Sequence, residues 1–342
     1  MKKSLLALAA LTAFAGAASA QSSVTLFGIV DLNARSQKNG SAGEYKTLSQ
    51  DGINSSRLGF RGVEDLGGGM RAGFWIEGAL SADVGGGPTT ASGSTANPQT
   101  WQRRSTVSLL GNFGEIRLGR DYTPSFWNHT VFDVFGTNGV GSELNIYSLA
   151  SSLATTLVRA NNTIGYFLPA MGGLYGQVQV AAGEAATGNK YFGGRIGYGA
   201  GPFNIAFAYG KTDKTGAMID DVTEWNIGGS YNLGFLTMMG QYSKSEYSTS
   251  DVKSWTLGVA VPVGSGAFQA SYGSTDVGSA SASQIAVGYT YDLSKRTAIY
   301  AHYAQIDNDA GLKFTTSGSG PSVAAISGFK STGYEFGLRH SF

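Results

Sequence analysis

The chain ends in the stretch Gly333-Tyr334-Glu335-Phe336-Gly337-Leu338-Arg339-His340-Ser341-Phe342. One face of this stretch carries Tyr334, Phe336, Leu338, His340 and Phe342, and the other carries Glu335, Arg339 and Ser341. Because an extended strand points alternate side chains to opposite faces, the pattern predicts a strand with one mainly apolar and one polar face. Its length of about ten residues suits a tilted membrane strand, whereas soluble strands average about five or six residues.

The same alternation recurs along the chain. Apolar side chains that alternate with polar ones stand at Val24, Leu26, Val30 and Leu32, at Leu58 and Phe60, at Met70, Phe74, Ile76 and Leu80, and at Val107 and Leu109. A soluble β-sandwich would also alternate in this way, so alternation alone does not separate the two architectures.

The connections between these segments alternate between short and long, which favours a membrane barrel over a sandwich. Short turns are expected at 64–69, 111–114, 168–173, 199–202, 232–234, 262–266 and 292–296. Long connections are expected at 36–52, 82–100, 122–154, 184–190, 211–222, 246–251, 275–283 and 308–331. These boundaries predict an all-β protein, a 16-stranded antiparallel transmembrane β-barrel. An even number of strands places both termini on the short-turn side, where the last strand pairs with the first and no sheet edge remains.

Composition excludes several other classes of protein. The 342 residues include Gly 51 and Cys 0, and the formal net charge is +1. The glycines follow no collagen period, and the absence of cysteine excludes disulfide frameworks, zinc ribbons, iron–sulfur clusters and thiol catalysis. The charge balance gives no indication of a nucleic-acid partner. A mean hydropathy of -0.06 is far too low for a helical membrane protein.

The N-terminus indicates export. Lys2 and Lys3 precede an apolar run from Leu5 to Ala15, and Ala18-Ser19-Ala20 forms a small-residue cleavage site. This order predicts a cleaved signal peptide at residues 1–20, followed by a single barrel domain at 21–342. A short membrane anchor is the alternative, but the apolar run is well below the roughly 20 residues of a spanning helix.

Several motifs resemble those of a known family. They are Gln21–Gly28, Ser56–Gly62, Arg103–Val107, Gly114–Arg120 and the terminal Phe342. Over residues 21–342 the chain resembles the 16-stranded trimeric general porins, in particular the beta-proteobacterial branch. The resemblance implies a homotrimer in the outer membrane of a Gram-negative bacterium, surrounded by lipid and lipopolysaccharide. It also implies that the barrel-assembly machinery reads Phe342 as its signal.

The third long connection is the longest, and long loops in compact proteins are usually functional or disordered. Its segment Phe132–Gly139 resembles the porin constriction loop, which folds inward and narrows the lumen. The family usually has Pro-Glu before Phe-Gly, whereas this chain has Asp133-Val134. We expect Asp133, Asp121 and Glu143 to form the acidic side of the constriction; the alternative is that they are ordinary solvated charges.

A basic cluster is expected on the opposite wall. Arg57, Arg104 and Arg159 lie on the polar parity of their strands, within motifs that match the constriction arginines of the family, and Arg35 is a fourth candidate. The alternative is that some of these arginines pair with wall carboxylates such as Asp31 or Glu77 and only brace the barrel.

The predicted function is passive diffusion of small hydrophilic solutes and ions, with a weak preference for anions. Three arginines about 10 Å from an ion contribute about 1 kcal/mol before screening, which favours anions several-fold but does not exclude cations. A substrate-selective channel and a plugged adhesin-like barrel are the alternatives. No catalytic residue, metal site or cofactor is predicted, because His129, His302 and His340 lack the spacing of metal ligands and no nucleophile–base pair is evident.

Overall fold

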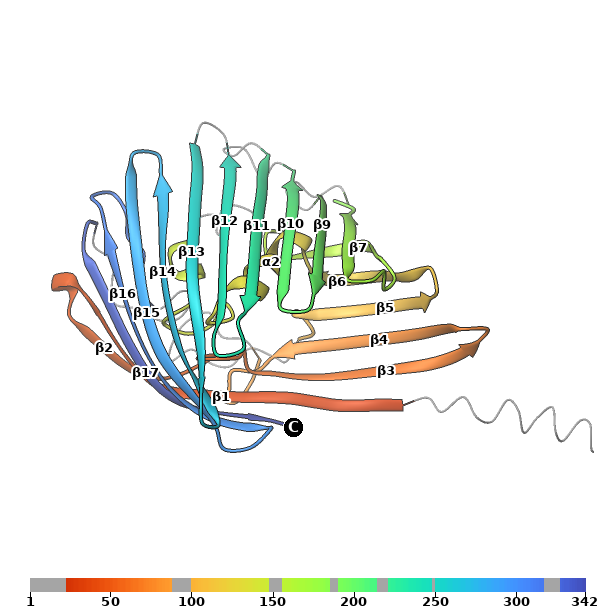
Figure 1. The fold of residues 1–342 in the computed structure, drawn as a ribbon, viewed down its shortest axis with the longest axis horizontal. Helices are drawn as coiled ribbons and strands as arrows, with labels where there is room; N and C mark the ends of the chain where they lie inside the picture. The colour runs from red at the N-terminus through yellow and green to blue at the C-terminus, as the bar shows by residue number, and fades with distance from the viewer. Residues whose placement is uncertain are drawn as a thin grey trace, which may run out of the picture.

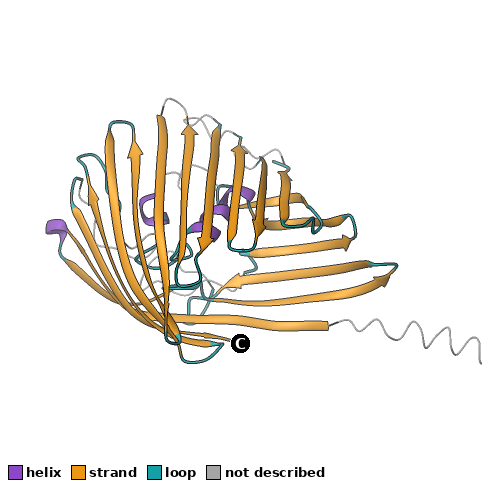
Figure 2. Cartoon of the chain, viewed as in Figure 1, coloured by secondary structure: helices purple, strands orange, loops and turns teal. Residues whose placement is uncertain are grey.

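The computed structural model describes residues 23–87, 100–147, 156–184, 190–213, 221–247, 250–316 and 327–342. Within these residues the strands form one antiparallel sheet that closes on itself through β1 and β17 (Figures 1 and 2). The strands are β1 (Ser23–Asn39), β2 (Glu44–Gln50), β3 (Arg57–Gly67), β4 (Met70–Ala79), β5 (Arg104–Gly111), β6 (Gly114–Tyr122), β7 (Arg159–Phe167), β8 (Leu174–Ala181), β9 (Tyr191–Ala200), β10 (Phe203–Thr212), β11 (Val222–Asn232), β12 (Thr237–Tyr247), β13 (Ser250–Val263), β14 (Gly266–Val277), β15 (Ala280–Asp292), β16 (Thr297–Asn308) and β17 (Lys330–Ser341). The helical segments are η1 (Gly40–Ala42) and α2 (Pro124–Phe132).

The strands β2 and β3 occupy one position in the barrel. Both pair with the long strand β1, β2 along its second half and β3 along its first half. The fold is therefore the predicted closed 16-stranded antiparallel barrel. The predicted connection at 36–52 is wrong, because the alternation continues through β1 and β2 and only η1 and Gly43 join them.

Residues 51–56 interrupt this barrel position and turn into the lumen. Asp51 adopts a left-handed φ of 63°, and its carboxylate accepts the Ser56 N–H at 2.6 Å. The carboxylate of Asp31 on β1 accepts the N–H groups of Ile53 and Asn54 at 2.9 and 2.8 Å. These polar side chains take the place of the strand ladder, so the backbone leaves the sheet without losing its hydrogen bonds.

The two faces of the barrel have opposite polarity, as the alternation predicts. Exposed large apolar side chains cover the outer face, among them Val24, Leu26, Val107, Leu257 and Phe336. Buried polar side chains line the inner face, among them Gln177, Gln241, Ser254, Gln284 and Glu335. This is the arrangement of a barrel with lipid outside and water inside.

The C-terminal residue closes the barrel. The N–H of Phe342 donates to the Gly28 carbonyl at 3.0 Å, and the N–H of Gly28 donates to the Phe342 carbonyl at 3.1 Å. A side chain at position 28 would collide with the Phe342 ring, so this glycine makes room for the terminal aromatic. The C-terminus lies beside β1 at the short-turn side (Figure 1).

Residues 123–147 leave the wall after β6 and pack against the inner face of the barrel. The helix α2 in this segment lies behind β10 and β11 in the view of Figure 1. We refer to residues 123–147 as the inner loop. No helix within the described ranges is long and apolar enough to cross a membrane.

Candidate functional site: the inner loop and the arginine wall

The helix α2 is fixed to the barrel by buried amides. Pro124 stands at its first turn, where its missing N–H has no intrahelical partner to lose. The side-chain amide of Asn128 donates to the Ala206 carbonyl at 3.2 Å and to Oδ1 of Asn226 at 2.8 Å. Arg195 on β9 donates to Oδ1 of Asn128 at 2.5 Å. One face of α2 is therefore tied to β9, β10 and β11.

His129 makes the charged part of the same anchor. Its Nδ1 lies 2.7 Å from Glu143 of the inner loop, and its Nε2 lies 2.8 Å from Glu224 on β11. All three side chains are buried. Burial alone would lower the pKa of His129, but the two carboxylates raise that pKa to about 10. The imidazolium therefore joins the loop to the wall as a double ion pair.

Glycines on the inner wall receive the apolar side chains of the loop. A Cβ at Gly228 on β11 would lie 2.2 Å from the Phe132 ring, and one at Gly258 on β13 would lie 2.8 Å from Val134. These positions seat the loop because they carry no side chain. They account for part of the high glycine content, since an inner wall with larger residues would hold the loop further into the lumen.

The tip of the inner loop reaches the interrupted barrel position. A Cβ at Gly139 would lie 2.3 Å from the Gly52 carbonyl, and Ser55 donates to Oδ1 of Asn138 at 2.9 Å. The Val140 N–H donates to Glu335 on β17 at 3.2 Å. The loop therefore spans the lumen from β11 to β17 and to residues 51–56.

The two loop carboxylates, expected on the acidic side of a constriction, are both buried and hold parts of the inner loop. Asp133 accepts the N–H groups of Phe135, Thr137 and Glu143 at 3.0, 2.9 and 3.1 Å. Burial and the nearby Glu143 charge raise the pKa of Asp133 to about 7, although these donors oppose the shift. Glu143 itself is taken up by His129 and by the Gln241 amide. Both carboxylates therefore help to hold the inner loop in place.

Most of the predicted basic residues gather on the wall opposite. Nη1 of Arg57 lies 3.4 Å from Glu77, and Nε of Arg103 lies 2.6 Å from the same carboxylate. Arg159 donates to the Arg103 carbonyl at 2.9 Å, and its guanidinium lies 4.2 Å from the centre of the Tyr122 ring. These contacts bring Arg57 and Arg159 together through Arg103.

Arg104 continues the group along β5 and β6. Its guanidinium lies 4.5 Å from the centre of the Trp75 ring, and its Nε lies 3.7 Å from Asp121. Arg117 pairs with the same Asp121 at 2.6 Å and with Glu115 at 2.8 Å. Asp121 is therefore part of the basic wall, and its expected position opposite the arginines is wrong. We call Arg57, Arg103, Arg104, Arg117 and Arg159, with Glu77, Glu115 and Asp121, the arginine wall.

Arg35 differs from the other candidates. Its guanidinium lies 2.7 Å from Glu335, and the side chains of both residues are buried. Glu335 also receives the loop N–H of Val140 and lies 3.2 Å from Nδ1 of His302. Arg35 was expected as a fourth residue of the basic side; its burial beside Glu335 indicates that it supports the inner loop.

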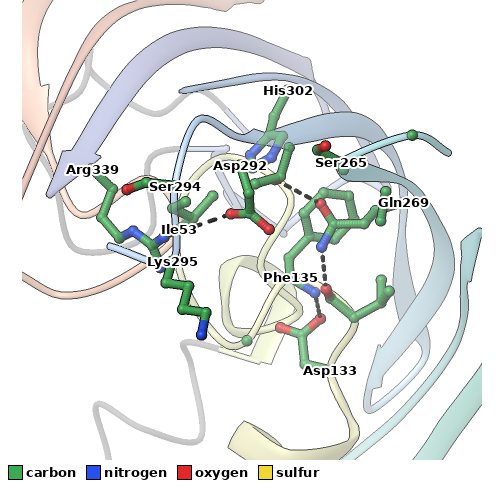
Figure 3. Close-up of a pocket in the computed structure, with 16 residues that line it drawn as sticks. Ile53, Asp133, Phe135, Ser265, Gln269, Asp292, Ser294, Lys295, His302 and Arg339 are labelled. Atoms are coloured by element: carbon green, nitrogen blue, oxygen red, sulfur yellow. Dashed lines mark hydrogen bonds and ion pairs between the residues drawn. The ribbon is translucent and has the colours of Figure 1, made fainter. Parts of the chain in front are cut away.

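A hollow of about 850 Å³ lies beside the inner loop (Figure 3). Asp133 and Phe135 of the loop line one side, and Gln269 holds the loop by donating to the Val134 carbonyl at 2.7 Å. Asp292 and Arg339 line the other side and lie 3.8 Å apart. The hollow therefore lies between the inner loop and the inner wall of the barrel.

The geometry combines a closed membrane barrel, a polar interior and an inner loop fixed across the lumen. The family model for Gram-negative porins matches residues 7–311. The chain belongs to the Gram-negative porin family. It is 39% identical, over all of both chains, to outer membrane porin protein 32 of Delftia acidovorans, and 27% identical over the full lengths to an outer membrane porin protein of Bordetella pertussis. The family resemblance and the outer-membrane location predicted from sequence are therefore confirmed.

Solved structures agree with this assignment. The anion-selective porin from Comamonas acidovorans is 34% identical and has a TM-score of 0.82. The match covers 94% of the present chain and 100% of that porin. The outer-membrane protein OmpT of Vibrio cholerae matches over 94% of this chain with a TM-score of 0.69 at 14% identity, which supports the fold alone. The protein is an outer-membrane porin, and porins are channels.

One residue of the arginine wall, Arg103, was not singled out from sequence, whereas Glu77 was named as a carboxylate that could pair with the arginines. Arg103 precedes the first residue of β5, where strand alternation no longer assigns a face, and Glu77 links it to Arg57. The adjacent arginines Arg103 and Arg104 are the sequence feature that could have indicated a second arginine at this place. Among the described residues, no group of three or more histidine and acidic side chains is arranged to hold a metal ion.

Proposed function

We propose that this porin is a general diffusion channel for small hydrophilic solutes and ions, with a weak preference for anions. The observation that carries the proposal is the unequal charge on the two sides of the lumen. The arginine wall holds five arginines and three carboxylates, a formal surplus of two positive charges. The inner loop contains Asp133 and Glu143 as its only acidic residues, and both are buried.

The size of this surplus sets the size of the selectivity. Two unit charges about 10 Å from an ion in a water-like medium contribute about 0.8 kcal/mol, or about a fourfold preference before screening by salt. That value favours anions and still admits cations. The 34% identical anion-selective porin supports the same sign.

The aromatic side chains beside the arginines favour general diffusion over a selective track. Trp75 and Tyr122 lie under guanidinium groups, with ring centres 4.5 and 4.2 Å from Arg104 and Arg159. Rings stacked in this way hold the arginines in position and are not available as a continuous apolar path for a sugar.

Family membership also supports several proposals about processing and assembly. Residues 1–20, which lie outside the described residues, would be removed as a signal peptide to leave one barrel domain at 21–342. The mature chains would form a homotrimer in outer-membrane lipid and lipopolysaccharide. The barrel-assembly machinery would recognise the strand that ends in Phe342. We propose no catalytic activity and no cofactor.

Planar-bilayer recording of the purified porin tests the function. We expect stable ohmic steps that occur in threes, with no block by sugars. Absence of conductance would contradict an open channel, and saturable block by a particular sugar or by phosphate would favour a substrate-selective channel instead.

A further inference from the structure

The tip of the inner loop contains the pair Asn138-Gly139, one of two Asn-Gly pairs in the chain; the other is Asn39-Gly40. Asparagine is a chemically labile residue, because the next backbone nitrogen can attack its side-chain amide. Glycine in the following position favours this attack, since it has no Cβ to hinder the approach. The surroundings of each pair then determine whether the reaction proceeds in the folded porin.

The amide carbonyl of Asn138 is polarised by a neighbouring hydroxyl. Ser55 donates to Oδ1 of Asn138 at 2.9 Å. This oxygen gains negative charge when Cγ is attacked, and a fixed hydrogen-bond donor stabilises such a developing charge. Nε of Arg57 donates to the Ser55 carbonyl at 2.8 Å, so a guanidinium of the arginine wall is held on the same segment. Both contacts favour attack at Cγ.

The backbone nitrogen of Gly139 is the attacking group. Its N–H donates no hydrogen bond within the part of the chain that the structure describes, whereas the Asn138 N–H donates to the Phe135 carbonyl at 3.3 Å. An N–H without an acceptor is free to lose its proton to water. Asn138 and Gly139 are both partly exposed, so water reaches the pair.

The second Asn-Gly pair lacks this access. It has a similar donor, because the Ser331 hydroxyl donates to Oδ1 of Asn39 at 2.7 Å. Asn39, however, is completely buried, with 0% of its surface exposed. Water is needed to take up the proton of the attacking nitrogen and to open the product. The chain therefore contains a matched internal control in which the reaction is blocked.

We propose that Asn138 is a site of spontaneous deamidation, and that this reaction changes the tip of the inner loop from neutral to negative. The Gly139 nitrogen gives its proton to water and forms a bond to Cγ of Asn138. The bond between Cγ and the amide nitrogen breaks, and this nitrogen takes a proton from water and leaves as ammonia. A water molecule opens the resulting cyclic imide at either carbonyl, which gives an aspartyl or an isoaspartyl residue at position 138.

The new carboxylate lies beside the segment that holds Arg57. It repels the Gly136 carbonyl, which in the unmodified loop accepts from Nδ2 of Asn138 at 2.6 Å. It also offsets one of the two surplus positive charges of the arginine wall, which corresponds to about a twofold loss of anion preference before screening. This effect on selectivity rests on the proposed function, whereas the reaction itself does not.

Incubation of the folded porin in mildly alkaline buffer, followed by peptide mapping with mass spectrometry, tests the reaction. We expect the mass gain of an amide converted to an acid at Asn138, and none at Asn39. Ser55→Ala should slow the conversion about fivefold, because it removes one hydrogen bond to the developing charge. The matched control Ser331→Ala removes the corresponding hydroxyl beside Asn39 and should leave the rate at Asn138 unchanged.

Other results would contradict the site. No conversion at Asn138 would show that the folded loop prevents the reaction. Equal conversion at Asn138 and Asn39 would show that the Asn-Gly sequence alone determines it. An unchanged rate in Ser55→Ala would exclude the polarising hydroxyl, and the mapping of the unmodified porin stands whether or not this variant folds.

Reversal potentials recorded before and after incubation measure the effect on the channel. Anion preference should fall about twofold in the unmodified porin. It should not drift in Asn138→Gln, whose longer side chain forms the cyclic product far more slowly. Conversion without a change in selectivity would contradict the charge effect. Cation preference in the fresh porin would contradict the proposed function, and the mass gain at Asn138 would still decide the deamidation site.

Discussion

Nδ1 of His129 lies 2.7 Å from Oε1 of Glu143, fourteen residues further along the same inner loop. The other ring nitrogen lies 2.8 Å from Glu224 on β11, so one imidazolium joins two parts of the loop to the wall. Tyr147 packs on the same ring with its centre 4.4 Å away, and its hydroxyl is 2.7 Å from Ser245 on β12. The position of the loop in the lumen depends on this buried network.

The substitution His129→Gln should loosen the inner loop. It leaves two buried carboxylates without their positive partner, and breaking a buried ion pair by removing one partner costs about 3–5 kcal/mol. We expect larger current noise in single channels and a lower unfolding temperature, while the strand content by circular dichroism is unchanged. The control is His340→Gln on the outer face. Identical noise in both variants would show that His129 does not hold the loop.

Alkaline pH should loosen the same anchor in the unmodified porin. The pKa of His129 is raised from its ordinary 6.5 to about 10, so the stabilisation is complete below about 6.5 and is lost as the pH rises through about 10. Channel noise should therefore increase near pH 10, and this step should be absent in His129→Gln. An increase in noise of the same size in the variant would show that other titratable groups cause the change.

Asp133 should produce a separate effect at lower pH. Because its pKa is raised from 3.8 to about 7, the contribution of Asp133 to loop stability is present below 3.8 and is lost as the pH rises through 7. Asp133→Asn cannot ionise, and its single oxygen can still accept the N–H groups of Thr137 and Glu143, which share one carboxylate oxygen. The variant should match the original at pH 4 and be more resistant to denaturant at pH 9. Lower stability of the variant at pH 9 would mean that the ionised carboxylate supports the loop.

The close packing of the Phe132 ring against Gly228 can be tested with substitutions at two neighbouring glycines. Gly228→Ala adds a methyl group on the inner face at the Phe132 ring, and overpacking of this kind typically costs about 1–3 kcal/mol. Gly229→Ala adds the same group on the opposite face, where its nearest neighbour is 3.3 Å away. Urea unfolding in vesicles and single-channel conductance should change in the first variant more than in the second. Equal changes would exclude a close fit of Phe132 to Gly228.

Asp121→Asn should increase anion preference, because it removes a negative charge from the arginine wall. One unit charge about 10 Å from the ion path contributes about 0.4 kcal/mol, which corresponds to about a twofold change before screening. The reversal potential in a KCl gradient measures it, with Asp276→Asn on the outer face as the matched control. A shift toward cations would contradict the position of Asp121 on the wall.

Local patterns in the sequence predict most of the fold. The turn at 111–114 lies where expected, since β5 ends at Gly111 and β6 begins at Gly114. The outward parity of His340 also agrees with its alternation. Such features depend on neighbours in the strand and on glycine at turns, both of which are visible in the chain itself. The end of β1 and the strand β2 were missed because η1 joins them in a tight turn within a stretch rich in polar residues.

The direction of the loop carboxylates could not be predicted in this way. Asp133 bends back to N–H groups within its own turn, and Glu143 is held by His129 and Gln241, 14 and 98 residues away in the chain. The burial of Arg35 likewise depends on its contact with Glu335, 300 residues away in the chain. Parity assigns a side chain to the inner face, but its burial depends on partners that only the closed barrel brings together.

The reversal potential of single channels in a KCl gradient tests the central claim most directly. The original porin should prefer anions by about fourfold before screening, given its surplus of two positive charges. The variant Arg57→Gln, Arg104→Gln, Arg159→Gln leaves the arginine wall with one excess negative charge, so its reversal potential should change sign toward cations. Removal of Lys211, Lys244 and Lys253 from the outer face should preserve the sign. An original porin that prefers cations, or a triple arginine variant with unchanged selectivity, would contradict the account.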